Sequence, residues 1–451
     1  MGVVIQIGQL LLSLSILVIL HELGHFLFAK LFKTRVEKFY LFFDPWFSLF
    51  KFKKGETEYG VGWLPLGGYV KIAGMIDESM DKEQLKKPPQ PYEFRSKPAW
   101  QRLLIISGGV TVNLLLGIII YAFVLFTWGE KYLPTKNVTD GIWCTDSLVM
   151  DLGLKNGDKI ISINGVEPKR FSDIVTEMVF GGNMVIERDH KKKEINIPED
   201  FVGKLVDKKR SLLIYPRVPF IIKDIPDTSI NKNTGFKTLD RIISLNGSSV
   251  KYYDQFKPIA DSLKGRNISI GVLRGNDTLT LHGKLNNEGH LGVIITFPDY
   301  DEMDKLGIYE FKVRKFSFLE SIPAGLHKAK DKLGFYIKQF KLIFNFKTGA
   351  YKGLGGFGTI GGLFPPTWNW EAFWEITALL SLILAFMNIL PIPALDGGHV
   401  TFILYEMITG RKPGEKFLEY AQIIGMVILF SLLLYANGND FYRWIQGLFN
   451  K

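Results

Sequence analysis

Two histidines near the start of the chain are spaced so that both could bind one metal ion. His21 and His25 begin and end the motif His-Glu-Leu-Gly-His, and on a helix their imidazoles share one face, one turn apart. Glu22 follows the first histidine and could accept a proton from water during hydrolysis. With seven histidines in the chain, this pattern should arise by chance in well under about one sequence in a hundred. The motif predicts a zinc (Zn²⁺) site; two histidines in a polar seam between helices are the alternative.

A third ligand is needed, because catalytic zinc usually has three protein ligands. The candidate is Asp396, in the segment Asn-Ile-Leu-Pro-Ile-Pro-Ala-Leu-Asp-Gly-Gly-His at 388–399. The two prolines should end a helix, and Gly397 and Gly398 should let the chain turn tightly around Asp396. His399 is a rival ligand on chemistry alone, although after the glycine pair it could also face the cytoplasm or bond a carbonyl.

Asn388 begins this segment and has two interpretations. Its amide could donate a hydrogen bond to the oxyanion of a peptide under attack, or it could link two helices. We favour the first.

The composition indicates a protein that is partly embedded in a membrane. Of 451 residues, 47% are hydrophobic and 22% are charged, too apolar for an ordinary soluble enzyme and too charged for a chain that is membrane throughout. The net charge of +10 suits basic flanks of membrane spans. Because no basic cluster with stacking aromatics accompanies it, we expect no nucleic-acid partner. Cys144 is the single cysteine, which excludes an internal disulfide and predicts a small buried hydrophobe.

Four apolar runs are long enough to cross a hydrocarbon core of about 30 Å. The predicted transmembrane helices are 1–33, 103–129, 371–398 and 417–436. A cleaved signal peptide is the alternative for the first run. It is disfavoured because no Lys or Arg precedes the run and no small-residue cleavage site follows it.

Lys and Arg residues predict the orientation of the spans. They cluster between spans one and two, and again between spans three and four at Arg411, Lys412 and Lys416. Both connections should therefore be cytoplasmic, with both termini and the long segment 131–370 outside.

Spans one and three then run in the same direction, so His21, His25 and Asp396 end at one depth, toward the cytoplasmic side. Ionisable residues there cost roughly 2.5–3.5 kcal/mol each on insertion scales. A bound divalent cation would offset that cost.

The long outer segment contains an internal repeat. The phrase Gly-Asp-Lys-Ile-Ile-Ser-Ile-Asn-Gly at 157–165 returns at 239–247 as Leu-Asp-Arg-Ile-Ile-Ser-Leu-Asn-Gly. It resembles a strand and turn of PDZ domains, so we expect PDZ-like modules at 130–215 and 216–300, with Leu239 in place of the first glycine. Such modules could bind extended peptides at a sheet edge; β-domains without a ligand are the alternative. An amphipathic helix on the outer surface should follow at 316–346.

The chain resembles the site-2 protease family, in particular its bacterial RseP-type members, in three features. These are the His21–His25 motif in the first span, Asn388 with the Leu-Asp-Gly-Gly segment in the third, and a PDZ-bearing loop between them. The resemblance covers nearly the whole chain. One departure is Val110, where the family usually has proline.

The resemblance implies an α-helical polytopic membrane metalloprotease that cuts transmembrane segments, such as those of a trimmed anti-sigma factor and of remnant signal peptides. It implies His21, His25 and Asp396 as zinc ligands, Glu22 as the catalytic base and Asn388 as a substrate-binding residue. It also implies a re-entrant β-hairpin near 57–72, within a membrane-associated segment 34–102, that clamps unwound substrate. The glycines of that hairpin are Gly60, Gly62, Gly67 and Gly68.

Two other functions compete with proteolysis. A catalytically silent scaffold would keep the PDZ-like repeat but has no need of Glu22 or Asp396. A metal transporter predicts ionisable residues along a path through several spans, whereas here they gather at one depth. The physiological substrate, the cleaved bond and the oligomeric state cannot be read from the residues.

Overall fold

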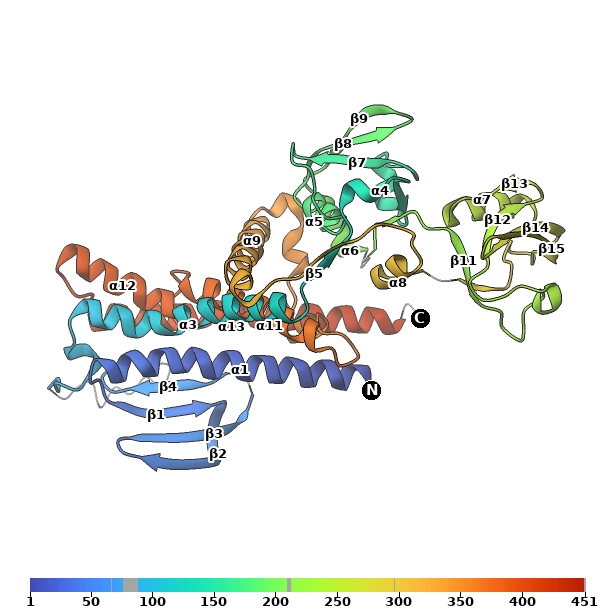
Figure 1. The fold of residues 1–451 in the computed structure, drawn as a ribbon. Coiled ribbons are helices and arrows are strands. Elements are labelled where there is room, and N and C mark those ends of the chain that lie inside the picture. Colours follow the sequence, from blue (N-terminus) through green and yellow to red (C-terminus); the bar gives the residue numbers. More distant parts are fainter. Residues whose placement is uncertain (66, 76–87, 209–211, 296, 450–451) are drawn as a thin grey trace. The chain divides into compact units, whose positions relative to one another are not determined.

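The chain divides into two compact units in a computed structural model. The structure describes residues 1–65, 67–75, 88–208, 212–295 and 297–449. A helical unit contains 1–129, 315–341 and 354–451, and a β-rich unit contains 130–314 and 342–353. Figure 1 shows the elements of each.

Four helices of the described chain are long and apolar enough to cross a membrane, at the positions of the four predicted spans. They are α1 (Gly2–Leu31), α3 (Ala99–Thr127), α11 (Trp370–Ile389) and α13 (Glu415–Phe449). α3 is helical throughout, so Val110 introduces no break.

α1, α3 and α11 pack through small and polar side chains. A Cβ on Gly24 of α1 would lie 2.3 Å from the carbonyl oxygen of Gly108 on α3, so the two backbones touch there. The Ser381 hydroxyl of α11 donates to the Asn113 carbonyl of α3 at 2.7 Å. Because lipid is as apolar as leucine, close backbone contact and interhelical hydrogen bonds hold such helices together.

The third span is interrupted. α11 ends at Ile389, and α12 (Asp396–Thr409) begins after the bend at residues 390–395. Pro391 and Pro393 lack the backbone donors that a continuous helix needs. An ion pair between Arg102 of α3 and Glu406 of α12, 2.6 Å between Nη2 and Oε1, ties α12 to α3.

The segment after α1 forms a sheet whose strand order is β2-β3-β1-β4. The strands are β1 (Val36–Leu41), β2 (Phe43–Lys54), β3 (Thr57–Leu64) and β4 (Tyr69–Ile72). β1 and β4 run along α1 (Figure 1).

The predicted hairpin at 57–72 is wrong. β3 and β4 do not pair with each other, because β1 lies between them, parallel to β3 and antiparallel to β4. The hairpin of this sheet is instead β2–β3, which pairs Lys54 with Thr57 across a turn where Gly55 has φ +63°. Leu66 lies outside the described residues.

The edge strand β2 exposes large apolar side chains. Trp46 is 92% exposed, and Phe47, Leu49 and Phe50 are also exposed. An apolar patch of this kind is typical of a surface that contacts lipid or protein.

α9 (Phe318–Phe344) forms at the predicted amphipathic segment and packs by a stripe of small residues. Ser321, Gly325 and Ala329 are buried, and a Cβ on Gly325 would lie 2.6 Å from the backbone nitrogen of Ala122 on α3. Leu319, Ile322 and Leu326, expected on the apolar face, are exposed. The short α10 (Phe357–Gly361) follows.

The β-rich unit contains two hydrophobic cores, one for each copy of the repeat. Its first strands are β5 (Glu130–Tyr132), β6 (Ile142–Cys144), β7 (Lys159–Ile163), β8 (Gly182–Arg188), β9 (Lys191–Ile197) and β10 (Ile214–Pro216). The later strands are β11 (Phe220–Asp224), β12 (Arg241–Leu245), β13 (Ser248–Ser249), β14 (Asn267–Arg274), β15 (Asp277–Lys284), β16 (Ile294–Ile295) and β17 (Lys312–Arg314). The helices are α4 (Ser147–Asp151), α5 (Asp173–Met178), α6 (Phe201–Asp207), α7 (Tyr253–Ser262) and α8 (Tyr300–Lys305).

The first core is built from two parts of the chain. Besides residues 133–218 it takes in Met303, Tyr309 and Phe311, which follow the second copy, and β17 pairs with β5. The first module therefore extends beyond the predicted 130–215.

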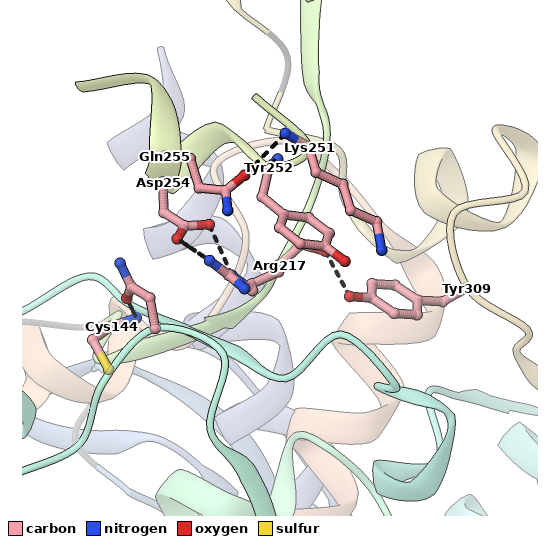
Figure 2. Close-up of polar contacts among 8 residues, drawn as sticks. Cys144, Arg217, Lys251, Tyr252, Asp254, Gln255 and Tyr309 are labelled. Atoms are coloured by element: carbon pink, nitrogen blue, oxygen red, sulfur yellow. Dashed lines mark hydrogen bonds and ion pairs between the residues drawn. The ribbon is translucent and has the colours of Figure 1, made fainter. Parts of the chain in front are cut away.

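A cluster of polar contacts surrounds the linker between the two cores (Figure 2). The guanidinium of Arg217 makes two hydrogen bonds to the Asp254 carboxylate, at 3.0 and 2.6 Å, and lies 4.4 Å from the ring centroid of Tyr252. The Tyr309 hydroxyl donates to the Arg217 carbonyl at 2.6 Å. These contacts tie the linker to residues of both cores.

Cys144 is 1% exposed, as expected for a small buried hydrophobe. Burial raises the pKa of its thiol to about 12. The thiol therefore stays protonated and unreactive at neutral pH.

The repeated phrase adopts the same local structure twice. Asp158 makes two hydrogen bonds to the Arg188 guanidinium, and Asp240 makes the same pair with Arg274. The residue before each acid is left-handed: Gly157 has φ +94° and Leu239 has φ +70°. Leu239 therefore keeps the geometry of the glycine that it replaces.

This conformation should cost stability, because an L-residue in the left-handed region loses about 1–2 kcal/mol. We expect Leu239→Gly to be more stable than Leu239→Ala by about 1 kcal/mol, since both remove the exposed side chain but only glycine relieves the strain. Hydrogen exchange of the β12 amides in the full-length protein measures the difference. Equal protection in the two variants would contradict it.

Candidate metal centre

The two motif histidines point to a common position from α1. The Nε2 atoms of His21 and His25 are 3.3 Å apart, and their rings meet edge to face at 4.9 Å between centroids. This follows from their spacing on one face of a continuous helix.

Asp396 brings a carboxylate to the same position from the first residue of α12. Its Oδ2 lies 3.3 Å from His21 Nε2 and 3.4 Å from His25 Nε2. Among the described residues, this trio is the group whose ligand atoms converge in the manner of a metal site, all within 4.8 Å of one another. His399, the rival ligand, is not a member of the group.

The donor set fits a divalent cation. Asp396 Oδ2 is buried and has no hydrogen-bond partner among the described residues. A buried anionic oxygen requires a compensating charge, and two imidazole nitrogens with one carboxylate oxygen match the ligands of a catalytic zinc that keeps a fourth position open.

α3 supplies the outer contacts of both histidines. His25 Nδ1 lies 2.9 Å from the Ile105 carbonyl oxygen, to which it can only donate. The His25 proton is therefore on Nδ1, leaving Nε2 free for a metal.

Asn113 makes the corresponding contact with Nδ1 of His21. Its side-chain amide lies 3.1 Å from His21 Nδ1, with Nδ2 placed toward the ring, while Oδ1 is buried without a partner among the described residues. Amide oxygen and nitrogen are assigned from such contacts. We infer the opposite orientation, in which Asn113 Oδ1 accepts the Nδ1 proton of His21.

Gly109 of α3 makes room for both rings. A Cβ there would lie 2.5 Å from His21 Cε1 and 2.5 Å from His25 Nε2. No other residue could occupy this position without moving the histidines.

Glu22 lies next to the sheet. Its carboxylate is close to the backbone amide of Val70 in β4, and a Cβ on Gly68 would lie 3.6 Å from Glu22 Cγ. β4 is an edge strand of the sheet, so a strand edge and the candidate base are neighbours.

The four hairpin glycines do not form one group. Gly60 and Gly62 belong to β3, which pairs on both sides, and a Cβ on either would overlap Tyr40 or Phe43. They are therefore packing positions within an inner strand of the sheet. Gly68, just before β4, is the one placed against α1 near Glu22. Gly67 has φ +151°.

Gly397 and Gly398 act differently from the expectation. Neither has a positive φ among the described residues; both lie in the first turn of α12. A Cβ on Gly397 would lie 2.1 Å from the Leu390 oxygen, and one on Gly398 2.7 Å from the Ile392 oxygen. Close approach of α12 to the bend, and not an unusual turn, requires these glycines.

Asn388 contacts His21 and also lines a cavity. Its Nδ2 is 3.5 Å from His21 Nε2, and it lines a cavity of about 270 Å³. Most of the other lining residues belong to α3 and the group is mostly apolar: Ser107, Val110, Thr111, Leu114, Leu115, Ile389 and Val400.

Sequence reasoning missed Asn113 and Gly109. Asn113 offered a signal, since a polar residue in an apolar span commonly marks a functional site. Gly109 offered only its membership of a glycine pair.

Known proteins match this chain over almost its whole length. The family model described as Peptidase family M50 matches residues 9–432. A regulator of sigma E protease of Haemophilus influenzae is 25% identical, over 97% of this chain and 99% of its own length. Protease RseP of Yersinia pestis is 25% identical, over 98% and 100%. A Rickettsia conorii protein named provisionally as a zinc metalloprotease is 28% identical, over 98% of both chains.

The contact with Asn113 should affect metal binding. We expect Asn113→Leu to weaken zinc affinity about 10–100-fold, because the acceptor that orients His21 is lost. Asn113→Asp, which keeps an acceptor oxygen, should stay within about threefold of the wild type by the same reasoning. Competition with a chromophoric chelator on the purified full-length protein gives these affinities. Wild-type affinity in Asn113→Leu would show that the amide does not orient the ring.

Proposed function

Because this chain belongs to peptidase family M50, a family of membrane metalloproteases of the site-2 type, we propose that it is a zinc-dependent endopeptidase that cuts peptide bonds within transmembrane segments. The observation that carries the proposal is the convergence of three ligand side chains beside Glu22. His21 and His25 lie on a helix apolar enough to cross a bilayer, and Asp396 begins the helix that follows the break in the third span.

In this proposal His21, His25 and Asp396 hold the zinc. When bound, zinc supplies a Lewis acid that polarises the scissile carbonyl and makes water acidic enough to lose a proton near neutral pH. The Nδ1 contacts of the two histidines with α3 keep both Nε2 atoms directed at the ion.

Glu22 is the proposed proton carrier. Its carboxylate accepts a proton from the attacking water and passes it to the leaving nitrogen. In this proposal the neighbouring strand β4, with Gly68 and Val70 close to Glu22, keeps that carboxylate beside the histidines. Asn388, whose Nδ2 lies 3.5 Å from His21 Nε2, would donate its amide proton to the substrate oxygen as negative charge develops.

β4 is the proposed docking strand for substrate. A transmembrane substrate keeps its carbonyls in intrahelical bonds, so it must unwind before attack. An unwound segment that pairs with the edge of β4 would replace those bonds with strand bonds next to Glu22. The cavity beside Asn388 suits an apolar substrate side chain. Helix-breaking residues near the scissile bond should therefore favour cleavage.

The protein is a multi-pass protein of a bacterial inner membrane in this proposal. The Lys and Arg distribution supports periplasmic termini, a periplasmic β-rich unit and a site near the cytoplasmic side. The exposed apolar residues of β2 and α9 suit contact with lipid.

The substrates we propose are membrane proteins of the anti-sigma-factor type and remnant signal peptides. Support comes from the relative named regulator of sigma E protease. The two modules of the β-rich unit, interpreted as PDZ-like, would either bind peptides or exclude substrates with bulky outer domains. A silent scaffold is disfavoured, because it offers no reason for Asp396 to join two histidines that are distant in sequence.

The test separates two proposed roles at the site, proton transfer by Glu22 and metal binding by Asp396. We expect Glu22→Gln to abolish cleavage of a transmembrane reporter, since its amide cannot accept the proton, while zinc content stays near that of the wild type. Asp396→Ala should lose both cleavage and most of the zinc, because one of three ligands is gone. Metal analysis and a cleavage assay on the purified full-length variants measure both.

Leu239→Ala, which changes the β-rich unit and not the helical unit that carries the site, is the control and should keep both properties. A Glu22→Gln protein that still cuts would remove Glu22 as the base. A wild-type protein with neither zinc nor cleavage would favour the scaffold.

A further inference from the structure

The bend at residues 390–395 contains a strained residue two positions before Asp396. Ala394 has φ +76°, a left-handed conformation that costs an L-residue about 1–2 kcal/mol. Such a conformation persists only where the surrounding structure holds it. The contacts that hold Ala394 therefore matter for the carboxylate that follows.

One of those contacts comes from α13. The Gln422 side chain is buried, with 5% exposed, and its Oε1 accepts a hydrogen bond from the Ala394 backbone amide at 3.1 Å. A buried amide that served no contact would be costly inside an apolar helix. Gln422 thus satisfies the backbone donor of the strained residue.

A second contact lies one turn further along α13. A Cβ on Gly425 would lie 1.8 Å from the Pro393 carbonyl oxygen and 2.3 Å from its carbonyl carbon. The backbone of α13 therefore touches the backbone of the bend. Positions 422 and 425 share one helix face, so together they form a seat for Pro393 and Ala394.

The position of the bend determines the position of Asp396, because the two are in direct contact. Gly397 and Gly398 pack against the carbonyl oxygens of Leu390 and Ile392, so the first turn of α12 lies directly on the bend. A shift of the bend would therefore shift the Asp396 carboxylate relative to the two Nε2 atoms.

α13 has other specific contacts near its C-terminal end, where Asp440 accepts hydrogen bonds from the Gly356 and Thr359 amides. Its apolar stretch is nevertheless loosely packed. Only 11% of its apolar stretch is buried, against 39% for α3 and for α11. At its far end, Asn437 Oδ1 accepts from the Phe357 amide at 3.2 Å. The seat at Gln422 and Gly425 is thus a specific contact on a loosely packed helix, and not a small part of an extensive interface.

We propose that Gln422 and Gly425 of α13 are positioning residues, which seat the strained bend and thereby hold the third metal ligand, Asp396, against His21 and His25. The inference rests on the proposed zinc site. It makes the last helix part of the catalytic scaffold and not only a membrane anchor.

The test compares three substitutions in the full-length protein. Gln422→Met keeps the length of the side chain but removes the acceptor, and Gln422→Glu keeps an acceptor oxygen. Asn437→Ala is the matched control, because it removes one side-chain acceptor for a backbone amide from the same helix, away from the bend. Zinc affinity by chelator competition and the visible absorption of the Co²⁺-substituted protein report on the coordination.

We expect Gln422→Met to bind zinc about 10–100-fold more weakly, the size of effect typical of contacts behind metal ligands, with an altered Co²⁺ spectrum. Gln422→Glu should recover affinity to within about threefold, and Asn437→Ala should stay within about twofold of the wild type, on the same basis. If Gln422→Met does not fold, Gln422→Asn replaces it, since its amide is one methylene too short to reach Ala394.

Two outcomes would overturn the inference. Wild-type zinc affinity and Co²⁺ spectrum in Gln422→Met or Gln422→Asn would show that the bend needs no seat. An equal loss in Asn437→Ala would mean that general loosening of α13 is responsible. Both differ from failure of the proposed function, in which the wild-type protein itself binds no zinc.

Discussion

The structure depends on burying two imidazoles and a carboxylate at one point among helices, most of which are apolar enough to cross a membrane. Ionisable groups in such a place are costly unless they compensate one another or a bound ion. Asp396 Oδ2 lies within 3.4 Å of both histidine Nε2 atoms and is buried without a hydrogen bond from the part of the chain that the structure describes. A divalent cation would satisfy the carboxylate, so the helices that carry these residues must be held with little freedom.

Much of the helical unit holds in place the helices that carry His21, His25 and Asp396. Gly24 and Gly108 let α1 and α3 touch, and Gly109 leaves room for the rings. α3 then supplies acceptors behind both histidines, from the Ile105 carbonyl and the Asn113 amide. Small residues in these helices are therefore part of the metal centre, although none of them binds the ion.

The remaining sides of the centre come from a sheet and from the broken third span. β4 places a backbone amide close to Glu22, and the same strand is an edge to which an unwound peptide could add. The bend is held from α13 through Gln422. Four segments far apart in the sequence thus meet at one site, each fixing a different part of the reaction.

The sequence by itself determined whatever depends on neighbouring residues. The spacing of His21 and His25 sets two ligands on one helix face, the apolar runs set four spans, and the repeated phrase sets two similar β structures, with Leu239 in the glycine conformation. Only the tertiary structure decided what depends on packing between distant segments. It placed β1 between β3 and β4, and it brought the Asp396 carboxylate to the two imidazoles. It also brought Asn113 to His21 and Gln422 to the bend before Asp396. The reason is physical: helix periodicity and span length are local properties, whereas strand order and contacts between helices depend on how all the segments pack together.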